Sequence, residues 1–241
     1  MLRASGNWNL PNFQTELDAL DVLLGRQIDG LIILGGQLPD ERLRAVAAQL
    51  PLILVGRTAA GLEDRSLQID NHRGAYDAVR YLVRSGHTRI AHITGDMGQP
   101  DAQARYAGYR AALEDSGIGI DPRLIVEGTF QEQGGIQAVE ALLERGAEVS
   151  AIFAANDSMA HGARLALFRH GIEVPGDISL VGFDDQSNSI YCIPPLTTVR
   201  QPALEMGAHA AAAMLRLLEG KPLELPAIAT ELIVRESTRQ R

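Results

Sequence analysis

Two polar residues with complementary hydrogen-bonding chemistry end two apolar runs in the second half of the chain. Asn156 ends AIFAAN, Asp184 ends ISLVGFD, and SMAHGARLALFRHG, which has helical spacing, separates them. This order predicts a βαβ unit, whose parallel strands end at the same edge of a sheet. An amide and a carboxylate side by side at that edge can hydrogen-bond a small polar molecule, where open α/β sheets bind their ligands. The residues therefore predict a binding site.

Motifs for catalysis or cofactor binding do not occur. No G-x-G-x-x-G follows a predicted strand, and the sequence has no Walker loop, G-x-S-x-G elbow or H-E-x-x-H pair. Asp184 and Asp185 are adjacent carboxylates, but neighbours on a strand face opposite ways, so only one can point into a given cleft. We predict a protein that is not an enzyme and needs no cofactor or metal. An enzyme using this pair on a glycoside or nucleoside is an alternative, which predicts turnover.

Composition indicates an ordinary globular protein. The 241 residues are 46% hydrophobic and 22% charged, enough for one large α/β domain or two lobes. No apolar run approaches the roughly 20 residues that span a bilayer, no signal peptide precedes the first element, and Cys192 is the single cysteine. We expect a cytoplasmic protein without a membrane partner. The net charge of −8 argues against binding nucleic acid unaided, so a DNA-binding element would be a separate piece.

Short apolar runs alternate with stretches of helical spacing, which is typical of parallel sheets covered by helices. The predicted strands are residues 30–34, 52–56, 66–69, 89–95, 124–126, 149–157, 178–185 and part of 227–237. One predicted helix ends at Gly25, and the others span residues 40–50, 74–86, 102–116, 134–145, 158–171 and 204–219. The side chains of Asp70 and Asn71 can cap the N-terminus of the helix at 74–86.

These elements predict an α/β fold of two Rossmann-like lobes, each with a parallel sheet flanked by helices. We assign residues 1–95 plus 200–224 to the N-terminal lobe and residues 96–199 plus 225–241 to the C-terminal lobe. The extended segment IPPLTTVRQP and the helix and strand after it suggest three crossovers between the lobes. Multiple crossovers favour a hinged protein with its ligand cleft between the lobes.

Six segments in order carry a family likeness: IDGLIILGG, RSGHTRIAHITG, QARYAGYRAAL, AIFAANDSMAHG, EVPGDISLVGFDD and IPPLTTVRQP. Over residues 1–241 the chain resembles the effector-binding, dimerising core of the LacI/GalR family of bacterial transcription regulators. The family's helix-turn-helix and hinge helix have no counterpart in this sequence. Residues 1–8 match the family's second strand, so the resemblance implies that the first strand and helix of the N-terminal lobe are missing. Operator DNA is then expected as a partner only of the full-length protein.

The resemblance also implies a ligand site. Eight positions are implied to contact the effector, the first three as its main ligands: Arg105, Asn156, Asp184, Phe130, Asp101, Gln99, Gln201 and Arg57. A guanidinium and a carboxylate suit the adjacent hydroxyls of a sugar or an acid group. The implied function is to bind a small metabolite, with a sugar as the first expectation, and thereby to switch DNA binding in a homodimer.

Several of these residues have simpler explanations. Arg105 follows Asp101 by four residues and could form a helix-surface pair. Asn156 and Asp157 could cap the next helix, which is the interpretation we favour for Asp157. Phe130 could be a core residue, and Arg57 a solvated or lobe-bridging charge. The alternative function is a periplasmic-type sugar receptor of a transporter, although the low aromatic content of 5% and the lack of a signal peptide weaken it.

Overall fold

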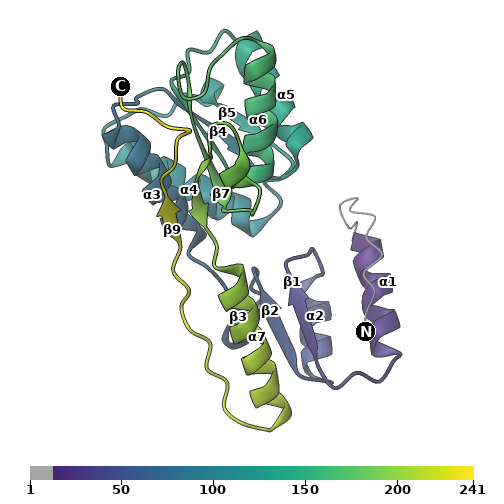
Figure 1. The fold of residues 1–241 in the computed structure, drawn as a ribbon. Coiled ribbons are helices and arrows are strands. Elements are labelled where there is room, and N and C mark those ends of the chain that lie inside the picture. The colour runs from purple at the N-terminus through teal and green to yellow at the C-terminus, as the bar shows by residue number, and fades with distance from the viewer. Residues whose placement is uncertain (1–12) are drawn as a thin grey trace. The chain divides into compact units, whose positions relative to one another are not determined.

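A computed structural model describes residues 13–241, with side chains from Glu16 onward (Figure 1). The helices are α1 (Phe13–Leu24), α2 (Asp40–Ala47), α3 (Asn71–Arg84), α4 (Pro100–Glu114), α5 (Glu132–Glu144), α6 (Asp157–Arg169) and α7 (Ala203–Leu218). The strands are β1 (Leu31–Leu34), β2 (Leu52–Val55), β3 (Ser66–Leu67), β4 (Ile90–Thr94), β5 (Ile125–Glu127), β6 (Ala151–Ala154), β7 (Ser179–Asp184), β8 (Thr197–Arg200) and β9 (Glu231–Ile233). Every helix and strand predicted within the described residues is present, with ends shifted by a few residues. The strand expected at residues 1–8 lies outside the described residues.

The chain forms two compact units. The first comprises residues up to Gln68 together with Ala203–Ile228, and the second comprises Ile69–Pro202 together with Ala229–Arg241. The chain therefore passes between the units three times, as the sequence predicts. The predicted boundary at residue 95 differs from the observed one, because β4 pairs with β5 and β6 of the second unit. Residues 69–95 thus belong with the C-terminal lobe.

The first unit is built on a three-stranded parallel sheet in the order β1-β2-β3. All four residues of β2 are buried, and Leu52 and Leu54 pack with α2 side chains such as Leu43 and Val46 in one apolar cluster. α7 also contacts β1 and β2. β1 is the edge strand of this sheet within the described residues, and its Leu34 is 74% exposed. An equally apolar strand is thus far less buried at the edge than in the centre.

The second unit contains a six-stranded sheet in the order β5-β4-β6-β7-β8-β9, parallel except for β9. The predicted βαβ unit is confirmed, since β6 pairs in parallel with β7 and α6 connects them. β4 and β6 are buried along their whole length, as expected of strands covered on both faces. Figure 1 shows α3 and α4 on one side of this sheet and α5 and α6 on the other.

Glycines allow the paired helices of the second unit to approach closely. A Cβ atom on Gly162 of α6 would lie 1.8 Å from the carbonyl oxygen of Glu132 in α5. A Cβ atom on Gly108 of α4 would lie 2.2 Å from the carbonyl oxygen of His72 in α3. Both helix pairs therefore need a residue without a side chain at their contact. Within residues 13–241, no helix is both long and apolar enough to cross a membrane.

Candidate functional site

Three residues predicted from the sequence come together in the second unit, at the carboxyl ends of β6 and β7. Arg105 projects from α4 and is only 3% exposed. Its Nη1 donates to the carbonyl oxygen of Ala155 at 2.5 Å and lies 3.5 Å from Asp184 Oδ1. Asn156 directly follows Ala155, and Asp184 ends the neighbouring strand β7. The βαβ geometry therefore places the amide and the carboxylate at one rim, and α4 brings the guanidinium to them.

Asn156 serves the fold and leaves hydrogen-bonding capacity for a ligand. It is the N-cap residue of α6, where its Oδ1 accepts from the backbone N–H of Met159 at 2.9 Å. Its Nδ2 donates to the carbonyl oxygen of Phe130 at 2.9 Å. The capping interpretation is therefore correct for Asn156. A side-chain amide has two N–H groups and two acceptor lone pairs, so one of each is left.

Arg105 does not form the helix-surface pair with Asp101 that the sequence allowed. Its guanidinium lies over the ring of Phe183, 3.8 Å from the centroid, and its Nε donates to Asn71 Oδ1 at 2.8 Å. Asn71 Nδ2 in turn donates to Asp101 Oδ1 at 3.0 Å. Asn71 thus bridges Arg105 and Asp101, a role that sequence analysis missed because it regarded Asn71 only as cap chemistry. The cap of α3 is its neighbour Asp70.

Asp184 is held in an unusual backbone conformation at the rim. Its φ is 110°, outside the regions that side-chain-bearing residues favour, and such backbone strain costs roughly 1–3 kcal/mol. Gln201 Nε2 donates to Oδ1 of this carboxylate, which is also the atom nearest Arg105. Burial raises the pKa of Asp184 to about 6, with Arg105 and Gln201 opposing the shift and the charges of Asp157 and Asp101 adding to it. The carboxylate is therefore mostly ionised at neutral pH.

The residues gathered at this rim are suited to polar, uncharged groups. The carboxylate accepts hydrogen bonds, the Asn156 amide can donate one and accept one, and the positive charge of Arg105 is already next to Asp184. Among the described residues, no group of three or more His, Cys, Asp or Glu side chains is placed to hold a metal ion. The arrangement can bind and orient hydroxyl groups.

Comparisons with known proteins agree with the fold and the motifs. Residues 79–238 match the family described as the periplasmic binding protein-like domain. The transcriptional regulator GalR of Escherichia coli (strain K12) is 39% identical over 226 residues, which are 93% of this chain and 66% of that protein. The repressor CytR of the same strain is 37% identical, over 94% of this chain and 67% of CytR. The chain belongs to the LacI/GalR family of transcription regulators.

A solved structure of the same family has the same fold. It is a sugar-binding transcriptional regulator of the LacI family from Escherichia coli, complexed with phosphate. It superposes with a TM-score of 0.86 at 32% identity, covering 95% of this chain and 84% of that one. The curated relatives GalR and CytR are regulators, not enzymes, and this chain spans about two thirds of their length.

Three other positions implied by the LacI/GalR resemblance lie near Arg105, Asn156 and Asp184. Asp101 is linked to Arg105 through Asn71, Gln201 contacts Asp184, and the carbonyl oxygen of Phe130 accepts from Asn156. Phe130 is half-buried, and its φ is 61°. The ring of Phe130 lies against Gly95, where a Cβ atom would be 1.9 Å from its Cζ, and 5.9 Å from the Arg105 guanidinium. It also packs on the apolar core, so it contributes to both core and rim.

Gln99 and Arg57 lie differently. Gln99 immediately precedes α4 and is half-buried. Arg57 belongs to the first unit, where its guanidinium donates to the carbonyl oxygens of Gly36 and Leu38 at 3.0 and 2.9 Å. Its side chain is 11% exposed, so it is not the solvated charge that the sequence allowed. Its part in effector binding stays a prediction.

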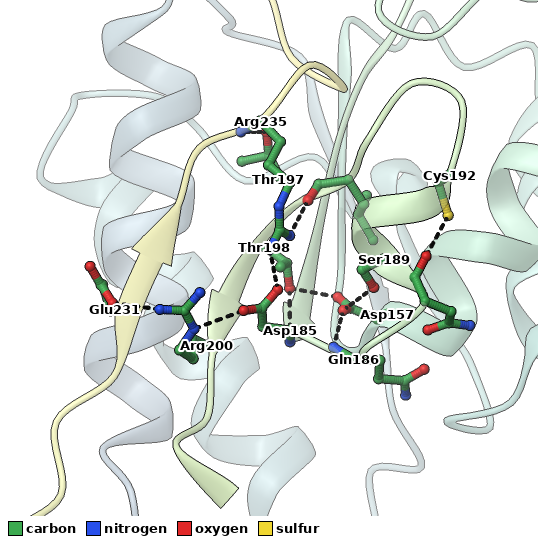
Figure 2. Close-up of polar contacts among 12 residues, drawn as sticks. Asp157, Asp185, Gln186, Ser189, Cys192, Thr197, Thr198, Arg200, Glu231 and Arg235 are labelled. Carbon is green, nitrogen blue, oxygen red and sulfur yellow. Dashed lines mark hydrogen bonds and ion pairs between the residues drawn. The ribbon is translucent and has the colours of Figure 1, made fainter.

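Asp157 is not the helix cap that the sequence suggested. Its carboxylate is fully buried and accepts from Ser189 Oγ and Thr198 Oγ1, both at 2.5 Å, and from the backbone N–H of Gln186 at 2.9 Å (Figure 2). Burial raises its pKa, while these hydrogen bonds oppose the increase. Asp157 therefore connects the start of α6 to β8 and to the segment after β7.

Proposed function

We propose that this chain is the effector-binding and dimerisation core of a LacI/GalR-type regulator and that it binds a small hydroxyl-rich metabolite, with a sugar as the first candidate. The observation that carries the proposal is the strained Asp184 carboxylate beside the buried Arg105, at the rim where Asn156 has unused hydrogen-bonding capacity. A carboxylate with a charged donor beside it can accept from one hydroxyl while neighbouring groups bind the next. The cleft between lobes expected from the sequence stays a prediction.

Effector binding is proposed to control DNA binding through two conformational states. An effector shifts the equilibrium between them only to the extent that it binds one state more tightly. The DNA-binding segment is proposed to lie outside this chain, whose net charge of −8 is unsuited to a phosphate backbone. The full-length protein would act in the cytoplasm, where its operator is.

We also propose that the chain forms a homodimer through the second unit. Phe168 of α6, Tyr191 and Ile193 are 78%, 83% and 89% exposed. Phe168 and Ile193 line the same hollow, and large exposed apolar side chains grouped on one surface mark protein interfaces. Size-exclusion chromatography with light scattering should give a dimer at micromolar concentration. Phe168→Glu together with Ile193→Glu should give a monomer, and a wild-type monomer would contradict the proposal.

A thermal-shift screen of sugars, polyols and purines tests effector binding. A ligand at about 100 times its Kd stabilises the protein by roughly 2.7 kcal/mol. Asp184→Asn should remove the shift, because the amide cannot replace the carboxylate beside Arg105. Asp77→Asn is the matched control, since Asp77 makes an exposed ion pair with Arg73 at 2.9 Å and does not contact the rim. A shift that persists in Asp184→Asn would exclude this site.

A further inference from the structure

β7 ends at Asp184, Asp185 follows it directly, and the two side chains lie on opposite sides. Asp184 faces Arg105 and Gln201, while Asp185 accepts from Arg235 at 2.6 Å and from Arg200 at 2.8 Å (Figure 2). The sequence prediction that only one of the two can face a ligand agrees with this geometry. The second carboxylate therefore has a role that effector contact does not explain.

Asp185 is held firmly on its side of the turn. Its side chain is only 10% exposed, and its φ is 55°. Burial alone would raise the pKa of Asp185, but the hydrogen bonds and charges of Arg235 and Arg200 outweigh it and lower that pKa. Arg200 also pairs with Glu231 of β9 at 3.2 Å. We call these four residues, Asp185, Arg200, Arg235 and Glu231, the Asp185 clamp.

The clamp is joined to the proposed effector site through consecutive residues at the ends of two paired strands. Asp184 ends β7 and is followed by Asp185, and Arg200, which pairs with Asp184 in the sheet, ends β8 and is followed by Gln201. Gln201 contacts Asp184 on one side, and Arg200 contacts Asp185 on the other. The backbone N–H of Gln201 also donates to the carbonyl oxygen of Asp184 at 3.3 Å. Two neighbouring positive φ values cannot persist unless surrounding contacts fix them, and the clamp supplies such contacts.

We propose that Asp185, held between Arg200 and Arg235, is the positioning residue that fixes the Asp184 carboxylate for effector binding. This inference rests on the proposed function, because it assigns Asp184 to the effector. Asp185 does not touch the ligand. It orients the turn that presents Asp184 to Arg105, and it ties this turn to β9.

The first arm of the test measures binding of D-glucose, D-galactose, D-ribose and cellobiose by calorimetry on the full chain. Asp185→Asn removes the charge but keeps a side chain of the same shape that also tolerates positive φ. It should raise the Kd of a bound sugar roughly tenfold, the scale of one misplaced charge-assisted hydrogen bond. Asp77→Asn should leave that Kd unchanged. An unchanged Kd in Asp185→Asn, with or without a lower Tm, would overturn the proposal.

The second arm needs no ligand and separates positioning from simple electrostatics. It follows the pKa of Asp184 by carboxyl ¹³C NMR in wild type, Arg235→Gln and Arg235→Lys. Removing a nearby cation by itself would raise the Asp184 pKa from about 6. Release of the turn exposes the carboxylate to water, so we expect the pKa to fall toward its ordinary value in Arg235→Gln and to fall less in Arg235→Lys. A pKa that rises or stays unchanged in Arg235→Gln would refute the clamp.

The two arms keep the inference distinct from the proposed function. If none of the four sugars binds the wild type, sugar binding fails, and the titration alone decides whether Asp185 positions Asp184. If Asp185→Asn does not fold in the first arm, or Arg235→Gln in the second, Arg200→Gln replaces it there, because Arg200 is 45% exposed and also contacts Asp185. The expected direction of each result is the same for that variant.

Discussion

The two units use equally apolar sequences to different effect. In the second unit β6, with the sequence AIFA, lies between two strands and is buried along its length. In the first unit β1, with the sequence LIIL, is an edge strand within the described residues and alternates between half-buried and exposed positions. Burial of an apolar strand is thus decided by its neighbours and not by its composition. Exposed apolar edge strands are also prone to pair with other chains.

The largest expected effect contrasts a central and an edge strand of the first unit. Leu54 of β2 is fully buried, so Leu54→Ala should cost roughly 2–5 kcal/mol of unfolding free energy. Leu34→Ala should change it by less than about 0.5 kcal/mol, because Leu34 is largely exposed. Urea denaturation of both variants checks this. A large loss in Leu34→Ala would mean that the edge of β1 is covered in solution.

The helices offer a second contrast, beginning with α6 of the second unit. Gly162→Ala would place a Cβ atom against backbone of α5, which cannot move aside as a side chain can. We expect a loss of roughly 1–3 kcal/mol, the usual cost of overpacking a core. Chemical denaturation followed by circular dichroism measures it. A neutral result would show that α5 and α6 separate more easily than their packing suggests.

Local patterns predicted the elements and placed Asn156 and Asp184 at the rim, whereas Arg105 was implied only by the family resemblance. Apolar runs end at polar residues, and a βαβ unit brings strand ends together whatever surrounds it. The lobe boundary failed because the run 89–95 does not reveal which sheet it joins. That is decided by pairing of β4 with β6, more than fifty residues later.

Asn71 and Asp157 show the same limit at the level of single residues. Asn71 follows Asp70 and Asp157 follows Asn156, so each lies beside a residue type that caps helices, and local chemistry favoured capping for both. Their actual partners, Arg105 for Asn71 and Ser189 and Thr198 for Asp157, lie far away along the chain. Roles set by such distant partners cannot be derived from one sequence.

The ionised Asp184 carboxylate should make the ligand-free protein less stable than a neutral side chain at the same position would. Because the pKa of Asp184 is raised, the folded protein favours the protonated carboxyl group. The stability that this contributes is fully present below the unfolded pKa near 3.8 and is lost as pH rises through about 6. Asp184→Asn should therefore stabilise the ligand-free protein at pH 7 by roughly 2–3 kcal/mol, and its stability should depend less on pH between 4 and 6. Denaturation curves across that range measure both effects. A destabilised variant would show that the ionised carboxylate supports the fold.

A smaller effect is expected as a gain in the first unit, at a helix glycine without the close contact that Gly162 makes. Gly207 lies inside α7, and a Cβ atom there would meet nothing within 4 Å outside its own helix. Gly207→Ala should stabilise the protein by roughly 0.5–1 kcal/mol, because alanine loses less backbone entropy in a helix. Thermal unfolding of the pair Gly207→Ala and Gly162→Ala should thus show opposite shifts for the same chemical change. A loss in Gly207→Ala would show that this face of α7 is packed against another surface in solution, which would make helix glycines in both units sites of close contact.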